Sequence, residues 1–134
     1  MKLKDILLET NRDYFYLMHL SYGTSRSRKP LWRYARKKCL VGLDHLDPDI
    51  DRKWEKVSER QKNHLSRDWR RHFELFCNRM TANDCVLVID AMDYLLGIGL
   101  IDGQYLFKPE LKMPVFFRHV RSVRWLLKYK YEER

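Results

Sequence analysis

Residues 81–108 contain the feature that most constrains the fold, a run of apolar side chains with almost no polar face. Between Cys85 and Leu96 only two aspartates interrupt the apolar and aromatic residues. A helix that is apolar nearly all round must be enclosed by other elements. Thr81 suits the N-cap of such a helix and Gly97 suits its C-terminal end. We therefore predict a buried central helix around which the rest of the chain packs.

A short turn signal follows this segment. Asp102, Gly103 and Gln104 separate two short apolar stretches, residues 100–101 and 105–107. An Asp-Gly pair between apolar stretches is typical of a tight β-hairpin. The sequence thus predicts that the central helix leads into one small hairpin.

Most of the remaining chain shows apolar residues at intervals of three or four, which is typical of amphipathic helices. The predicted helices cover residues 2–20, 30–42, 48–80 and 114–127. The second ends at Gly42 and turns Leu31 and Ala35 inward and its basic side chains outward. The third is opened by Asp47-Pro48, and a helix with a short strand after Arg71 is the alternative to one long helix. A polar, basic loop is expected over residues 23–29. Residues 121–131 also alternate in a way that fits a strand; a helix is favoured because no turn residue lies between Phe116 and Leu127.

Together these patterns predict a mainly α protein. Its length of 134 residues fits a single domain, residues 1–134, with a core of ordinary size. We expect about five helices around the buried central helix, with one small β-hairpin.

The chain has no apolar run of the roughly 20 residues that a membrane span needs, and its first residues do not resemble a signal peptide. An intracellular, cytoplasmic location is therefore expected. Cys39, Cys77 and Cys85 lack the C-x-x-C spacing of zinc sites. They are interpreted as free thiols of a reducing compartment.

The net charge of +9 is distributed unevenly. Residues 25–38 contain seven basic side chains and no acid. Such segregation creates a field that attracts polyanions, and Trp32 beside these cations could stack on an unpaired base. A second basic set near the C-terminus would extend the surface if it lies on one helical face. The predicted nucleic-acid-binding residues are Arg26, Arg28, Lys29, Trp32, Arg33, Arg36, Lys37, Lys38, Arg118, Arg121 and Arg124.

Acidic residues cluster between Asp44 and Asp51, and clustered carboxylates can hold magnesium. Their spacing begins like a calcium loop, but Arg52 stands at the sixth position, where that loop needs glycine. Helix capping and the helix dipole explain these acids without a metal. We assign no metal site, cofactor or catalytic residue here.

His64, Asp68 and His72 lie four residues apart and would share one helical face. This spacing permits a metal site or a proton relay. The favoured interpretation is a solvated face of an amphipathic helix, because charged and polar residues normally occupy that position.

Two resemblances fall on one segment, DAMDYLLGIGLIDGQYLF. It resembles the end of a winged-helix module, although its aspartates would place negative charge on a helix that enters DNA. It is also similar to RusA-type Holliday-junction resolvases, whose helical Asp-Ala-Leu motif Asp90-Ala91-Met92 would match, with Asp102 as the following acid. The paired acids which that family places before the helix are replaced by residues 80–83, with only Asp84 nearby. This resemblance implies metal-dependent cleavage of DNA junctions.

The favoured hypothesis is a small basic nucleic-acid-binding protein without catalytic activity. The alternative is a protein inhibitor or adaptor, of mobile-element or phage type, that binds the nucleic-acid-binding groove of a partner. A metal-dependent nuclease of the junction-resolvase type is the third. DNA, RNA and protein partners, and the oligomeric state, stay open on the sequence alone.

Overall fold

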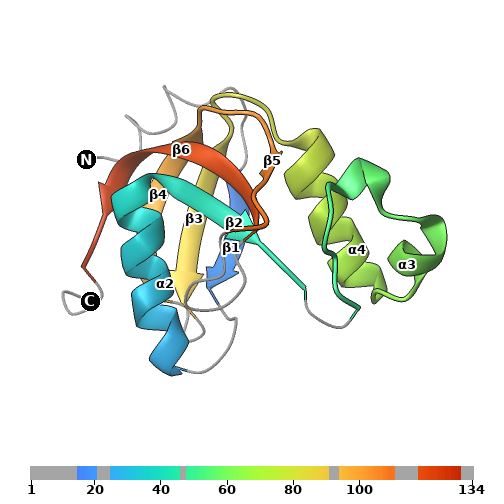
Figure 1. The fold of residues 1–134 in the computed structure, drawn as a ribbon. Coiled ribbons are helices and arrows are strands. Elements are labelled where there is room, and N and C mark those ends of the chain that lie inside the picture. Colours follow the sequence, from blue (N-terminus) through green and yellow to red (C-terminus); the bar gives the residue numbers. More distant parts are fainter. Residues whose placement is uncertain (1–14, 21–24, 46–47, 91–93, 111–117, 131–134) are drawn as a thin grey trace.

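The computed structural model describes residues 15–20, 25–45, 48–90, 94–110 and 118–130 (Figure 1). Within these residues the protein is a mixed sheet of six strands, curled into a half-barrel, with three α-helices. The expectation of a mainly α fold is therefore wrong.

The strands are β1 (Phe15–Leu20), β2 (Leu40–Leu43), β3 (Cys85–Asp90), β4 (Leu95–Ile101), β5 (Leu106–Phe107) and β6 (His119–Lys128). Their order in the sheet is β1-β3-β4-β6-β2, and β5 also pairs with β6. Strand β1 runs parallel to β3, whereas the other pairs are antiparallel. The helices are α2 (Ser25–Lys38), α3 (Glu59–Asn63) and α4 (Arg67–Glu74), with a 3₁₀ turn η1 (Trp54–Lys56) and a π-helical turn η2 (Leu75–Arg79).

The predicted central helix is instead a pair of antiparallel strands, β3 and β4, in which Cys85 pairs with Leu100. Both strands lie inside the sheet, where each is flanked on both edges. A strand buried on both faces shows the same continuous apolar run as a buried helix, so periodicity cannot separate the two. The β-branched residues Val86, Val88 and Ile89 favour the strand.

The expected hairpin around Asp102-Gly103 also does not form. Strands β4 and β5, on either side of these residues, each pair with β6 rather than with one another. The Asp102-Gly103 turn therefore separates β4 from β5, and both of these strands pair with β6. The antiparallel hairpin of this region is the one that joins β3 to β4.

Helix α2 confirms a helix in this part of the chain, with different ends. It begins at Ser25, so most of the expected basic loop is helical, and it ends at Lys38. Cys39 has a φ of 55°, a left-handed conformation that turns the chain directly into β2. Gly42, expected to end the helix, lies within that strand. Leu31 and Ala35 are buried, as predicted from their spacing.

The long helix predicted over residues 48–80 is divided into short pieces. The Ser58 side chain accepts a hydrogen bond from the Gln61 amide, and the Ser66 side chain accepts one from the Trp69 amide. Each serine is thus an N-cap that starts a helix of its own. Asp47, the expected start of the long helix, lies outside the described residues.

The first and last predicted helices are contradicted where the structure describes them. Residues 15–20 form β1 and residues 119–128 form β6, so the strand alternative for residues 121–131 is correct over residues 121–128. The other parts of these two predicted helices lie largely outside the described residues.

Helix α2 lies against the sheet, and the α3–α4 segment lies beside it (Figure 1). The main core joins α2, α4 and the sheet through side chains that are almost fully enclosed. They include Leu31, Trp32, Trp54, Phe73, Phe76, Val86, Leu96, Ile101 and Val120. Among the described residues, no helix has the length and apolar character required to cross a membrane.

Candidate nucleic-acid interface

Helix α2 carries most of the predicted binding residues on one element. Arg33, Lys37 and Lys38 are exposed, and Arg36 is half-buried. Leu31, Trp32 and Ala35 are turned into the core, so the cations occupy the side of the helix that faces away from the sheet. Arg26, Arg28 and Lys29 belong to the first turns of the same helix.

Trp32 belongs to the core and is only 1% exposed. Its indole N–H donates to the Tyr129 carbonyl oxygen at 2.8 Å, and its ring meets Trp125 edge-on at 5.1 Å. A side chain held in this way does not offer a free face to a base. Trp32 therefore anchors α2 on the sheet, in place of the stacking role expected from the sequence.

Arg118 is buried in an ion pair. Its guanidinium donates to both carboxylate oxygens of Asp44, at 2.9 and 2.8 Å, and to Asp49 at 2.6 Å. The hydrogen bonds that Arg118 donates to Asp44 raise the pKa of Arg118. This pairing explains part of the acidic loop, because Asp44 is itself 2% exposed and needs a cation beside it.

Arg121 is buried as well, and the hydrogen bonds of its guanidinium go to backbone carbonyl oxygens. It donates to Phe76 at 3.1 Å, to Met80 at 2.7 Å, and to Gly103 at 2.9 Å. Burial lowers its pKa from the ordinary arginine value. Arg121 thus satisfies the last carbonyls of η2, a structural role that a cation performs well at the C-terminal end of a helix.

Arg124 is exposed on β6. The sequence placed it on one helical face with Arg118 and Arg121, but side chains three positions apart point to opposite faces of a strand. The expected C-terminal basic stripe is thus not assembled. Of its three arginines, Arg124 is the one whose side chain solvent can reach.

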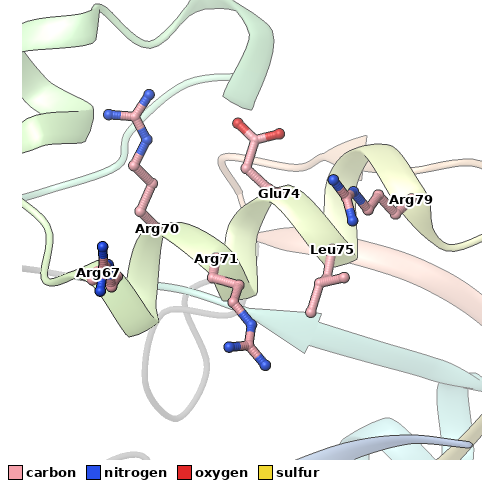
Figure 2. Close-up of a pocket in the computed structure, with 6 residues that line it drawn as sticks. All are labelled: Arg67, Arg70, Arg71, Glu74, Leu75 and Arg79. Carbon is pink, nitrogen blue, oxygen red and sulfur yellow. The ribbon is translucent and has the colours of Figure 1, made fainter.

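The structure brings together a basic cluster that the sequence interpretation missed. Arg67, Arg70, Arg71 and Arg79 line an open hollow of about 360 Å³ on α4 and η2, together with Glu74 and Leu75 (Figure 2). The sequence signal was the recurrence of arginine at positions 67, 71 and 79. It was overlooked because a charged side of an amphipathic helix is normally only solvated.

The acids of the resolvase resemblance are separated in space. Asp84 precedes β3 and Asp90 ends it, so the strand holds them roughly 20 Å apart. Asp84 accepts a hydrogen bond from the Thr81 amide at 2.9 Å, and Asp90 accepts one from the Tyr94 amide at 3.1 Å. Each carboxylate shapes its own turn, and neither lies on a helix.

The histidines and cysteines considered as possible metal ligands or reactive groups do not form a site in the described residues. His64 is exposed in the turn after α3, and Asp68 and His72 are exposed on α4. Burial raises the pKa of Cys77 to about 12, which keeps the thiol protonated and unreactive at neutral pH. In the part of the chain that the structure describes, no group of three or more His, Cys, Asp or Glu side chains is placed to hold a metal ion.

Fold and surface together define a small basic α/β protein built on a curled mixed sheet. The chain belongs to the family described as a domain of unknown function (DUF8426), whose model matches residues 19–134. No curated protein matches the chain.

Proposed function

We propose that this protein binds nucleic acid without cleaving it, through the outer side of α2. The observation that carries the proposal is a 14-residue helix with seven basic side chains and no acid, docked on the sheet by its apolar side. Arginine and lysine on such a surface neutralise backbone phosphates and release counterions. DNA and RNA both carry such backbone phosphates.

The position of the cations argues that they serve binding rather than helix stability. Arg36, Lys37 and Lys38 occupy the last turn, where positive charge interacts favourably with the helix dipole. Arg26, Arg28 and Lys29 lie near the opposite end, whose first turn contains no acid. Positive charge at a helix N-terminus is unfavourable, so a bound polyanion is the simpler reason for it.

The test is to change Arg33, Arg36 and Lys37 together to Glu. Binding of labelled duplex DNA, single-stranded DNA and RNA is measured by fluorescence anisotropy over a range of salt concentrations. We expect binding to be lost at moderate salt, because three phosphate contacts are replaced by repulsion. Circular dichroism checks that the fold is retained.

The control variant carries the same charge change at exposed positions elsewhere, with Arg52, Lys56 and Arg60 changed to Glu. Its affinity should fall much less. Equal loss in both variants would show that only net charge matters, and unchanged affinity in the α2 variant would refute the proposal. If the wild-type protein binds no nucleic acid, and a pull-down after nuclease treatment recovers one stoichiometric protein, the inhibitor or adaptor alternative is correct instead.

A further inference from the structure

The arginine-lined hollow on α4 and η2 is separate from α2. Arg67, Arg71 and Arg79 are exposed, and none of their guanidinium groups has a hydrogen bond or ion pair with another described residue. Arg67 and Arg71 stand four positions apart, where like charges on a helix destabilise it. The protein thus holds three exposed guanidinium groups around one hollow, and none of them forms an ion pair with a described carboxylate.

The π-helical turn η2 keeps Arg79 beside this group. In a regular α-helix, residues four positions apart are rotated by roughly 40° around the axis. Side chains at positions 67, 71, 75 and 79 would therefore turn progressively away from the side of the helix where the first one lies. Turn η2 is wider, as the hydrogen bond from the Met80 amide to the Leu75 carbonyl oxygen shows. A wider turn slows the rotation of the chain about the helix axis, and Arg79 lines the hollow together with Leu75. Such π-turns frequently occur at functional sites.

The one acid of the hollow is already occupied. Glu74 accepts hydrogen bonds from the Trp54 indole at 2.9 Å and from Asn78 at 2.8 Å. Burial acts to raise the pKa of Glu74, but these bonds and nearby Lys62 and Arg70 lower it overall. Figure 2 shows Glu74 and Arg70 pointing to one side of the helix, with Arg71 and Leu75 pointing to the other.

Arg70 differs from the other arginines of the hollow because it has partners. It donates to Glu59 at 2.8 Å and to Asn63, both contributed by α3. This contact joins α3 to α4 along the rim. Arg67, Arg71 and Arg79 therefore remain available to an external anion.

We propose that the hollow is a phosphate-binding site, a second contact to nucleic acid besides that of α2. Planar guanidinium forks bind phosphate oxygens in pairs, and the half-buried Leu75 side chain provides an apolar floor for the attached sugar. A hollow of about 360 Å³ is within the size range of small-ligand sites. The identity of the polyanion rests on the proposed function, whereas the phosphate chemistry does not.

The experiment compares two triple variants of the full chain. In the hollow variant Arg67, Arg71 and Arg79 are changed to Gln, and in the control variant Arg52, Lys56 and Arg60 are changed to Gln. Pyrophosphate binding is measured by calorimetry, and binding of labelled oligonucleotides by anisotropy against salt. The hollow variant should lose pyrophosphate binding and bind oligonucleotide at least about tenfold more weakly, with a salt slope smaller by about 2.

The outcomes separate the two proposals. Equal affinities of the hollow and control variants, for both probes, would overturn the phosphate site while leaving binding through α2 intact. Pyrophosphate binding that depends on the hollow, in a protein that binds no oligonucleotide, would support the site and refute the proposed function. A further variant, Arg71→Lys, should keep the salt slope but weaken binding, because lysine keeps the charge and loses the fork.

Discussion

At the scale of single residues, His119 connects the sheet to the segment that carries α3 and α4. Its Nε2–H donates to the Ile50 carbonyl oxygen at 2.7 Å, and its Nδ1 accepts from the Tyr105 hydroxyl at 2.7 Å. The Tyr105 oxygen in turn accepts from the Trp54 amide at 2.9 Å. A neutral imidazole fits this arrangement, because a protonated ring would have to donate to the Tyr105 oxygen, which already accepts from the Trp54 amide.

We expect the stability of the protein to fall in mild acid because of this histidine. Burial lowers the pKa of His119 below its ordinary value of 6.5, although Ile50 and the carboxylates of Asp44 and Asp49 oppose the shift. The unfolded chain therefore takes up a proton that the folded chain resists. The stabilisation is complete above the unfolded pKa and is lost as the pH falls below it. Urea unfolding at neutral pH and in mild acid measures the effect.

The control for this pH dependence is His119→Gln, whose amide cannot titrate. Other histidines titrate in both proteins, so the informative quantity is the difference in pH dependence between them. A variant that loses as much stability in acid as the wild type would show that His119 is not responsible.

At the scale of elements, the docking of α2 depends on a glycine in β4. A Cβ atom at Gly97 would lie 2.7 Å from the Trp32 ring and 3.0 Å from the Trp125 ring. Contacts this short require the neighbouring atoms to move. Gly97 therefore lets two tryptophan rings pack directly over the middle of the sheet.

Gly97→Ala should destabilise the protein by about 1–3 kcal/mol, as overpacking of a core does. The free energy of unfolding in urea measures the change. The matched variant combines Gly97→Ala with Trp32→Phe, whose smaller ring no longer fills this position. The double variant should lose less stability than the sum of the two single changes; additive losses would show that the glycine does not serve the tryptophan.

At the scale of the whole molecule, cationic residues gather on two elements, α2 and the α4–η2 helix, that lie on different parts of the fold (Figure 1). With a net charge of +9, these surfaces repel one another when no anion is bound. The α3–α4 segment is nevertheless held to the sheet, because Arg121 and His119 reach it from β6.

The melting temperature should therefore rise when sodium chloride is increased from about 20 to about 150 mM, because screening then weakens the repulsion. A nucleic acid that binds the folded state should raise it further through mass action. Differential scanning calorimetry measures both effects. The variant with Arg67, Arg71 and Arg79 changed to Gln should respond less to salt, and a melting temperature that falls on adding salt would contradict this explanation.

The sequence alone was enough to predict that a basic amphipathic helix carries Arg33, Arg36 and Lys37 outward and Leu31 and Ala35 inward. These features depend on neighbours three or four positions away, which the chain places on one face of a helix without help from distant segments. The charge of the molecule follows from composition in the same way. The role of the α2 basic side chains in nucleic-acid binding stays a prediction.

Only the tertiary structure decided that residues 85–90 and 95–101 are strands and that Arg118, Arg121 and Trp32 are buried. A continuous apolar run has no period, so its conformation depends on partners such as β1, whose Phe15 pairs with Cys85. Arg118 and Arg121 are buried because they donate hydrogen bonds to groups that are distant in the sequence. These groups are the Asp44 carboxylate for Arg118 and the Met80 carbonyl oxygen for Arg121. The hollow on α4 likewise depends on a π-helical turn. No local pattern of residues encodes these long-range contacts, because each is made by segments that meet only in the folded chain.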